Sequence, residues 1–363
     1  MRKDSFSSPQ RPRRWMNALL SASLICLLAL ALLIWRSEPN GQTKASHPSQ
    51  SYAQALEQAR LGKPGAARML YQQLVRDDMP DERLIALLAE LPHYPSPQAL
   101  KLLDTLLDHE SVAVREAAIQ SAVRLLPDNH LAVLLGPLLT DSDMQVRLAA
   151  TLALVPLSPD DLGLYFAALQ HSAESLQPFL ARQPPSASNL VQLARLYQQT
   201  GKSAQALASM EQAVKLQPDD LATGMARVEL LDDLGQADKA RQAFRSLLEK
   251  HPNAPELQHA LGKWLREHGQ AEFAVLSLAR ASELAPDNDD YHYDLALALH
   301  DLEQLEAAQK QLQQIVQNHP ANRKARVLLI QYAREAGQLQ NVQVLLAELE
   351  QQNPDDPTLQ QGL

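Results

Sequence analysis

The side chains best placed for chemistry form a small tyrosine–histidine cluster. Tyr291, His292 and Tyr293 are consecutive, and His300 follows His292 by eight residues. Two imidazoles that bind one metal ion from the same helix are normally four residues apart, which puts both on one face. A spacing of eight does not place the rings side by side, so we expect no metal ion here.

A second candidate is the acidic run Asp287–Asp290, whose carboxylate and amide oxygens suit a calcium ion. Similar acid pairs, Asp219-Asp220 and Asp355-Asp356, recur at the same distance before and after it. Acids at a repeated turn accept hydrogen bonds from the free N–H groups at the start of a helix. The pattern therefore predicts helix capping at successive turns.

Motifs typical of catalysis are absent from the sequence. It has no GxSxG nucleophile elbow, no phosphate-binding loop, no GxGxxG and no HExxH. Cys26 is the single cysteine, so the chain can form no internal disulfide and has no CxxCH haem-attachment site. These features predict a non-enzymatic protein without cofactor or metal, whose function rests on a binding surface.

The elements that would carry such a surface follow a strict 34-residue period. Its prolines are Pro218, Pro252, Pro286, Pro320 and Pro354. A glycine lies seventeen residues before four of them, and Glu303 takes that place in the fourth unit. This is the period of a helix–turn–helix repeat, in which no unit buries its apolar face without a stacked neighbour.

These units resemble tetratricopeptide repeats (TPR), on the evidence of matching positions such as Tyr197, Gly201 and Ala206 in the first unit. The pattern departs at Val228 in the second unit and at Ile330 in the fifth. The resemblance implies an all-α fold, a right-handed α-solenoid. The five units are 187–220, 221–254, 255–288, 289–322 and 323–356, followed by a tail at 357–363.

The period changes upstream of the TPR units. Val114-Arg115 precedes Ala117-Ala118, and thirty-two residues later Val146-Arg147 precedes Ala149-Ala150. With Asp141 placed before Arg147, this segment resembles HEAT repeats, which we assign to residues 82–186. We expect Arg115 and Arg147 to bond turn acids or carbonyls between stacked repeats. Gly136-Pro137 should kink or shorten the helix that contains it.

Residues 52–81 resemble one further, degenerate TPR-like hairpin, with Gly62, Ala67 and Tyr71 at the expected spacing. Exposed end faces of separate blocks would leave apolar surface in water. We therefore expect the HEAT-like and TPR blocks to form one continuous curved solenoid.

The start of the chain indicates a membrane anchor. Ala18–Trp35 carries no charge and is long enough, as a helix, to span about 27 Å. We assign a cytoplasmic basic tail to 1–14, a transmembrane helix to 15–35 and a linker to 36–51. The excess of basic residues before the span predicts a bacterial inner-membrane protein with its repeats in the periplasm. The alternative is a cleaved signal peptide.

Charge and resemblance together indicate the kind of partner. The formal net charge is −9, and it is concentrated after the basic first 36 residues, which argues against nucleic-acid binding. In the TPR family the first helix of each unit lines the concave, protein-binding face. Carried onto this chain, that face consists of Arg195, Gln198, Glu229, Asp232, His259, Lys263, Arg266, Tyr293, Leu297, His300, Gln331 and Arg334.

Two functions follow from these resemblances. The first is a membrane-anchored scaffold that binds partner proteins or peptides, for the assembly or maturation of an envelope complex. The second is an accessory subunit of a periplasmic c-type cytochrome system that itself lacks haem. It is suggested because HEAT-like units followed by TPR units also resemble the helical-repeat part of some multihaem periplasmic c-type cytochromes.

Overall fold

The structure is a computed structural model that describes residues 48–360. The chain divides into two units, Met1–Gln50 and Ser51–Leu363, and the second contains all the repeats. The predicted tail 1–14 and transmembrane helix 15–35, with most of the linker, lie outside the described residues. Within 48–360 no helix is long and apolar enough to cross a membrane.

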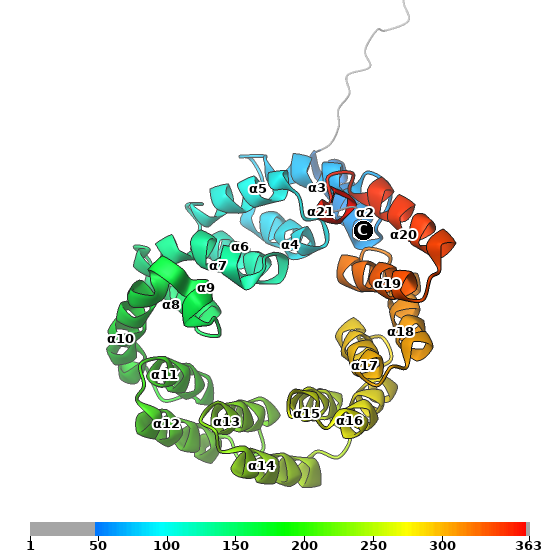
Figure 1. Cartoon of the computed structure of the whole chain (residues 1–363). Coiled ribbons are helices and arrows are strands. Elements are labelled where there is room, and N and C mark those ends of the chain that lie inside the picture. Colours follow the sequence, from blue (N-terminus) through cyan, green and yellow to red (C-terminus); the bar gives the residue numbers. More distant parts are fainter. Residues whose placement is uncertain (1–47, 361–363) are drawn as a thin grey trace, which may run out of the picture. The chain divides into compact units, whose positions relative to one another are not determined.

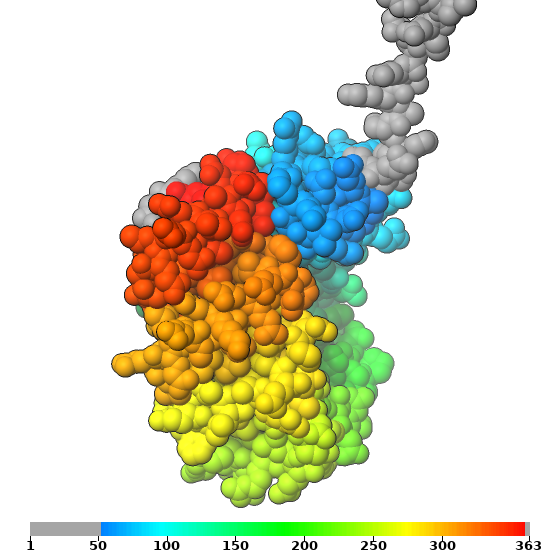
Figure 2. All heavy atoms as spheres, turned by 90° about the vertical axis from the view of Figure 1, so that its right-hand side faces the viewer, coloured from blue at the N-terminus to red at the C-terminus, as the bar shows by residue number. Residues whose placement is uncertain are grey.

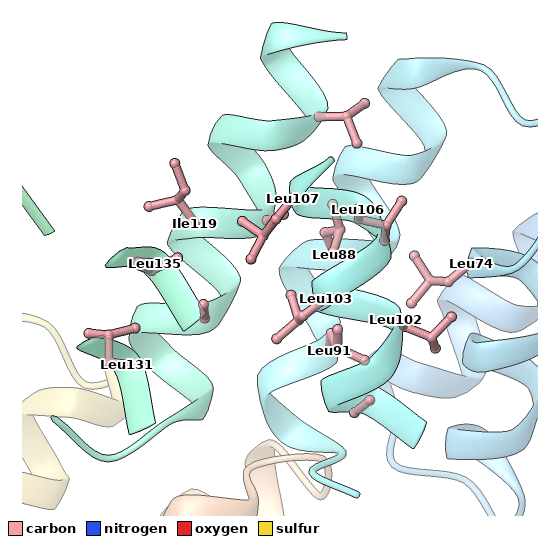
Figure 3. Packing of buried hydrophobic residues seen from close by; sticks show 14 of the residues in the cluster. Leu74, Leu88, Leu91, Leu102, Leu103, Leu106, Leu107, Ile119, Leu131 and Leu135 are labelled. Atoms are coloured by element: carbon pink, nitrogen blue, oxygen red, sulfur yellow. The ribbon is translucent and has the colours of Figure 1, made fainter. Parts of the chain in front are cut away.

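The first block of the repeat unit is made of short helices that carry one hydrophobic core. It contains α2 (Pro48–Arg60), α3 (Ala66–Leu74), α4 (Asp81–Glu90), η1 (Leu91–His93), α5 (Pro97–Leu107), α6 (Val112–Leu125), α7 (Asp128–Leu135), η2 (Gly136–Thr140), α8 (Met144–Leu154), α9 (Pro159–Leu162), η3 (Gly163–Tyr165) and α10 (Phe166–Arg182). Leu74 of α3 packs beside Leu102 of α5, and Leu88 lies beside Leu106 (Figure 3). The hairpin α2–α3 therefore belongs to the same core as the HEAT-like helices.

The second block consists of regular pairs of helices. The pairs are α11 (Ala187–Gln199) with α12 (Ser203–Leu216), α13 (Leu221–Asp233) with α14 (Ala237–Lys250), α15 (Pro255–Glu267) with α16 (Ala271–Leu284), α17 (Asp289–Asp301) with α18 (Leu305–Asn318), and α19 (Arg323–Glu335) with α20 (Leu339–Gln352); α21 (Pro357–Gln360) follows. Successive first helices begin 34 residues apart, at the residues where the five units were assigned. Residues 48–360 contain no strand.

Each TPR pair is held at its centre by a small residue and a bulky one. Ala206, Ala240, Ala274 and Ala308 have no exposed surface. The bulky positions from Met210 to Leu312 are also buried, whereas Leu346 of the last unit is only half-buried. In the third unit a side chain at Gly262 would place its Cβ 2.5 Å from Leu278 Cγ, so the close approach of α15 and α16 requires glycine.

The turn between the two helices of each TPR pair has a left-handed residue. Gly201, Gly235, Gly269 and Gly337 have φ between 69° and 71°. Glu303 takes the same conformation, with φ of 60°, and it is the one non-glycine residue with positive φ in 48–360. The backbone of the fourth unit therefore keeps the geometry of its neighbours at the expense of local strain.

The structure confirms the predicted role of one of the two HEAT-like arginines. Arg115 Nη1 donates to the carbonyls of His109 (2.7 Å) and Glu110 (3.1 Å), and its Nη2 pairs with Asp141 at 3.2 Å. Arg147 bonds the carbonyls of Asp141 and Ser142 in the turn before its own helix, so the predicted contact between repeats is made by Arg115 and not by Arg147. The helix over Gly136-Pro137 is also interrupted as predicted, because α7 ends at Leu135 and continues as the 3-10 helix η2.

The two blocks form one continuous array. At the junction, Ala173 and Leu176 of α10 share a buried cluster with Leu193 and Leu196 of α11. Figure 1 shows the helices following one another around a ring, with each first TPR helix on the inner side and each second helix on the outer side. Continuity between the blocks was predicted from the sequence.

The array also closes on itself, which was not predicted. The N-terminal hairpin α2–α3 lies beside α20, as Figures 1 and 2 both show. The Gly65 N–H donates to the carbonyl of Gln351 at 2.9 Å, and Asn353 Nδ2 donates to the carbonyl of Pro95 at 2.7 Å. Gly62 lies against the backbone of Pro320 and Ala321. We call this contact between the two ends of the array the seam.

The strain at Glu303 gives a direct test of the repeat phase. Because Glu303 is exposed and its turn requires positive φ, Glu303→Gly should raise the free energy of unfolding by about 1 kcal/mol. The reverse change in the next unit, Gly337→Ala, should lower it by a similar amount. Urea denaturation measures both. A loss of stability in Glu303→Gly would contradict the assigned geometry of this turn.

Candidate functional site

The predicted concave residues lie on the inner side of the ring, on α11, α13, α15, α17 and α19 (Figure 1). Most of them contact the next unit. Arg195 pairs with Glu229 at 3.2 Å, and Gln198 Nε2 donates to Asp233 at 2.9 Å. The members of each pair are 34 or 35 residues apart, so they occupy matching faces of neighbouring first helices.

The same pattern continues through the later units. His259 Nε2 lies 2.6 Å from Asp294 Oδ2, and Arg266 Nε donates to Asp301 at 2.5 Å. His300 Nε2 lies 2.8 Å from Glu335. We call this series of contacts along the inner face the inter-repeat ladder. Its first purpose is structural, because each rung joins two units across their shared groove.

Aromatic rings support the ladder. The His300 ring stacks on Tyr332 with centroids 4.3 Å apart and planes 4° apart, and the His259 ring lies 4.6 Å from Tyr291. Lys324 Nζ lies 4.0 Å from the centroid of Tyr293, a cation–π contact. The aromatic and lysine partners, and the acids of the ladder, were not among the predicted site residues. The acids could have been found from the sequence, since Asp294, Asp301 and Glu335 each follow a predicted residue by 35 positions.

The remaining predicted residues differ in whether they already have a hydrogen-bond or ion-pair partner. Asp232 pairs with His268 at 3.2 Å, and Gln331 donates to Glu335 at 3.1 Å. Leu297 is half-buried against the core of the last units. Within the described part of the chain, Lys263 and Arg334 have no hydrogen bond or ion pair, and Lys263 is exposed. These two side chains are the most available to a ligand.

Lys263 stands at the edge of a cleft between α13 and α15. The cleft has a volume of about 510 Å³; Met225, Ala226, Phe244 and Trp264 supply its apolar surface. Its charged lining comes from Arg195, Glu229, Asp232, Asp233, Lys263 and Glu267. A second cleft of about 380 Å³ continues from it toward α8 and shares Arg195 and Glu229 with it. We call the two together the inner cleft.

The inner cleft combines the properties of a peptide-binding groove. It has apolar surface that a side chain can cover and charged groups that can fix its orientation. The acids outnumber the permanent bases along its wall, in agreement with the acidic character of the repeat region.

The tyrosine–histidine cluster serves packing. His292 is buried and bonds the Pro286 carbonyl at 3.0 Å and Gln311 at 2.8 Å. One unit later, Arg326 stands at the equivalent position and bonds the carbonyl of Pro320 at 2.7 Å. His292 therefore holds the turn that precedes its own helix, and it does not join His300 in a common site.

The acidic run acts as predicted, at turns. Asn288 caps α17 by accepting from the N–H groups of Asp290 and Tyr291. Asp289 accepts from His319 and Asn322 of the next turn, at 2.7 Å each. In the described residues no group of three or more histidine, cysteine or acidic side chains is arranged to hold a metal ion.

Known families match three stretches of the chain. HEAT repeats match residues 67–155, and the tetratricopeptide repeat matches 198–263 and 293–357. The chain is a helical-repeat protein with HEAT-like and tetratricopeptide units. The HEAT match begins within α3, in agreement with the core that α3 shares with α4–α6.

One relative is the cellulose synthase operon protein C of Pseudomonas fluorescens (strain SBW25), which is 27% identical over 177 residues. The match covers 47% of this chain and 14% of that protein, so the chain spans a small part of its relative's length.

Solved TPR structures are also similar. MamA 41-end from Desulfovibrio magneticus RS-1 is 19% identical, with a TM-score of 0.39, over 48% of this chain and 96% of its own. The thermophilic TPR protein TTC0263 of Thermus thermophilus is 20% identical, with a TM-score of 0.38, over 52% and 98%. YrrB, described as a TPR protein with an unusual peptide-binding site, is 17% identical, with a TM-score of 0.38, over 52% and 98%.

Asp294 is an inner-face acid with a shifted pKa. Burial opposes its charge, yet the hydrogen bond from His259 and the charges of His259, Lys263 and Lys324 together hold the pKa of Asp294 below its ordinary value. A lowered folded-state pKa stabilises the fold above the unfolded-state pKa of about 4, and this stabilisation is lost as the pH falls through the folded-state value.

Asp294→Asn should therefore destabilise the protein by about 1 kcal/mol near neutral pH, because it removes a charged partner of His259. The difference in unfolding free energy between wild type and variant should shrink as the pH falls below about 4. Urea denaturation over a pH series measures it. Asp238→Asn on the outer helix α14, where the side chain is 98% exposed, is the control. Its unfolding free energy should not differ from that of wild type in this pH-dependent way.

Proposed function

We propose that this chain is a membrane-anchored, non-enzymatic scaffold that binds partner proteins through the inner cleft of its repeat array. The observation that carries the proposal is the inner cleft itself, an apolar surface rimmed by charges on α11, α13 and α15. Repeat arrays of this kind expose extended concave surfaces that bind other molecules. The recognised segment would place an apolar side chain over the partly exposed Met225 and Ala226 and a charged group near Lys263.

The free charges define how a partner would be oriented. Lys263 and Glu267 lie one helical turn apart on α15, line the same cleft and have no ion-pair partner in the described residues. A partner that contributes an acid to Lys263 and a base to Glu267 satisfies both without breaking the ladder. Such a contact gives register along the groove, while the apolar surface supplies affinity.

Membrane anchoring by residues 15–35 completes the proposal. It rests on the uncharged run Ala18–Trp35 and on the basic residues before it. A tether of this kind keeps the array close to membrane complexes and raises its effective concentration there without any new contact. We place the repeats in the bacterial periplasm.

The relative's name suggests where to look for partners. It refers to a cellulose synthase operon, so a polysaccharide-synthesis complex of the cell envelope is the first assembly to test. The alternative, an accessory of a c-type cytochrome system, takes no support from that name.

Photo-crosslinking tests the inner cleft. A photoreactive amino acid at Lys263 should give adducts with partner proteins in membranes, and the same amino acid at Lys310, an exposed lysine on the outer helix α18, should give few. Combining Lys263→Glu with Met225→Ala, both in the inner cleft, should lower the recovery of those partners about tenfold, the effect of about 1.4 kcal/mol. Equal adducts at both positions would remove the inner cleft from the proposal.

Residues 15–35 and the side of the membrane are tested together. In a Cys26→Ala background, Lys310→Cys should react with a membrane-impermeant maleimide in cells whose outer membrane alone has been opened. Deletion of 15–35 should move the protein from the membrane to the soluble fraction. Labelling only after full lysis would place the repeats in the cytoplasm, and a shortened soluble mature chain would indicate a cleaved signal peptide.

A further inference from the structure

The seam differs in kind from the other contacts of the array. Helices within each TPR pair pack extensively on one another. The seam residues Gly62, Gly65 and Asn353 instead lie in turns or just after a helix. Hydrogen bonds through Gly65 and Asn353 cross it, together with the backbone approach at Gly62. The buried hydrophobic clusters on its two sides, one ending at Ala59 and one at Leu349, do not merge.

Clefts also flank the seam. One, of about 520 Å³, lies between Arg60, Glu90 and His93 on one side and Asp289 and His319 on the other. The other, of about 830 Å³, has the turn from α6 to α7 as one wall and residues of α17 and α19 as the opposite wall. A contact made of a few polar bonds beside open clefts is weaker than a packed apolar interface.

The closed seam also brings inner residues of the two blocks to one cleft. In the larger cleft, Arg124 and Leu126 of the HEAT-like block line the same space as Tyr293, Lys324 and Gln331 of the TPR block. The two blocks therefore face each other across a single cleft at this end. Opening of the seam would separate the two walls of this cleft.

We propose that the α2–α3 hairpin is a latch: the array admits a folded partner to its inner face only when the seam opens. This inference rests on the proposed function in taking the inner face as the binding surface. A small or extended ligand enters the closed ring, and a bulky one requires opening. The latch thus sets which partners bind and how fast.

Two turn glycines provide a matched pair of variants. Both have positive φ, 58° at Gly62 and 71° at Gly201, so alanine strains the turn at either position. At Gly62 the new Cβ would lie 2.7 Å from Pro320 C and Ala321 N, both backbone atoms that cannot move aside. At Gly201, in the first TPR unit and away from the seam, the new Cβ meets nothing within 4 Å. Only Gly62→Ala pushes the two ends apart.

The opening is measured on the full-length protein in detergent, in a Cys26→Ala background. Spin labels at Arg68→Cys on α3 and Glu350→Cys on α20, both exposed, report the distance across the seam. Gly62→Ala should raise the long-distance population about tenfold over wild type, equivalent to about 1.4 kcal/mol. Gly201→Ala should leave it unchanged. The same distances in Gly62→Ala and wild type would overturn the latch.

Access to the inner face is measured without any partner. Lys263→Cys on the inner helix α15 and Lys310→Cys on the outer helix α18 are each treated with N-ethylmaleimide and with a polyethylene glycol maleimide of several kilodaltons. Gly62→Ala should raise the rate at which the polyethylene glycol maleimide labels residue 263 about tenfold. The other three labelling rates should stay unchanged. If the labels show opening and the bulky reagent is not accelerated, the seam does not gate the inner face. Neither result depends on whether a partner protein exists, so failure of the latch and failure of the proposed function are distinguishable.

Discussion

The constraint on which this structure depends is that a helical hairpin cannot bury its apolar face alone. Every unit must stack on the next, and in an open array the two end units are left with one uncovered face each. Repeat proteins usually meet this cost with terminal units whose outer face is polar. Here the ends cover each other, and residues such as Ala321, Asn353 and Asp356 are buried although they belong to the last turns of the array.

The last unit shows how that burial is balanced. Asp356 has no exposed surface and receives two bonds from Arg323, at 2.7 and 2.9 Å. A buried carboxylate is stable when a bidentate guanidinium satisfies it. Asn353 reaches across the seam to the carbonyl of Pro95, a residue far away in the sequence. The end of the array is thus completed by polar bonds, which suits a contact that must form and release.

Much of the fold could be predicted from the sequence because it is local. Positions such as Gly235 and Ala240 recur at fixed spacing because each repeat solves the same packing problem, and the first helices begin where that spacing puts them. The role of Arg115 in the HEAT-like block was predictable for the same reason. The seam was not, because ring closure depends on small rotations summed over all the units. In the sequence Gly62 looks like any other turn glycine, and nothing near it points to Pro320.

The positions of the candidate site residues could be predicted from the sequence, but their pairing with residues of the next unit was not predicted. The period places Arg195, His259, Arg266 and His300 on the inner face. Each has a partner one unit later, which was not predicted although an acid follows each of them by 34 or 35 positions. This pairing has a consequence for recognition. A ligand that binds a rung must replace a bond between units, so it gains little net energy from that rung. In the proposed function, affinity must then come from the partly exposed apolar surface of Met225 and Ala226 and from the unpaired Lys263. In the proposed function the ladder keeps the groove in shape, and the surface between its rungs contacts the partner.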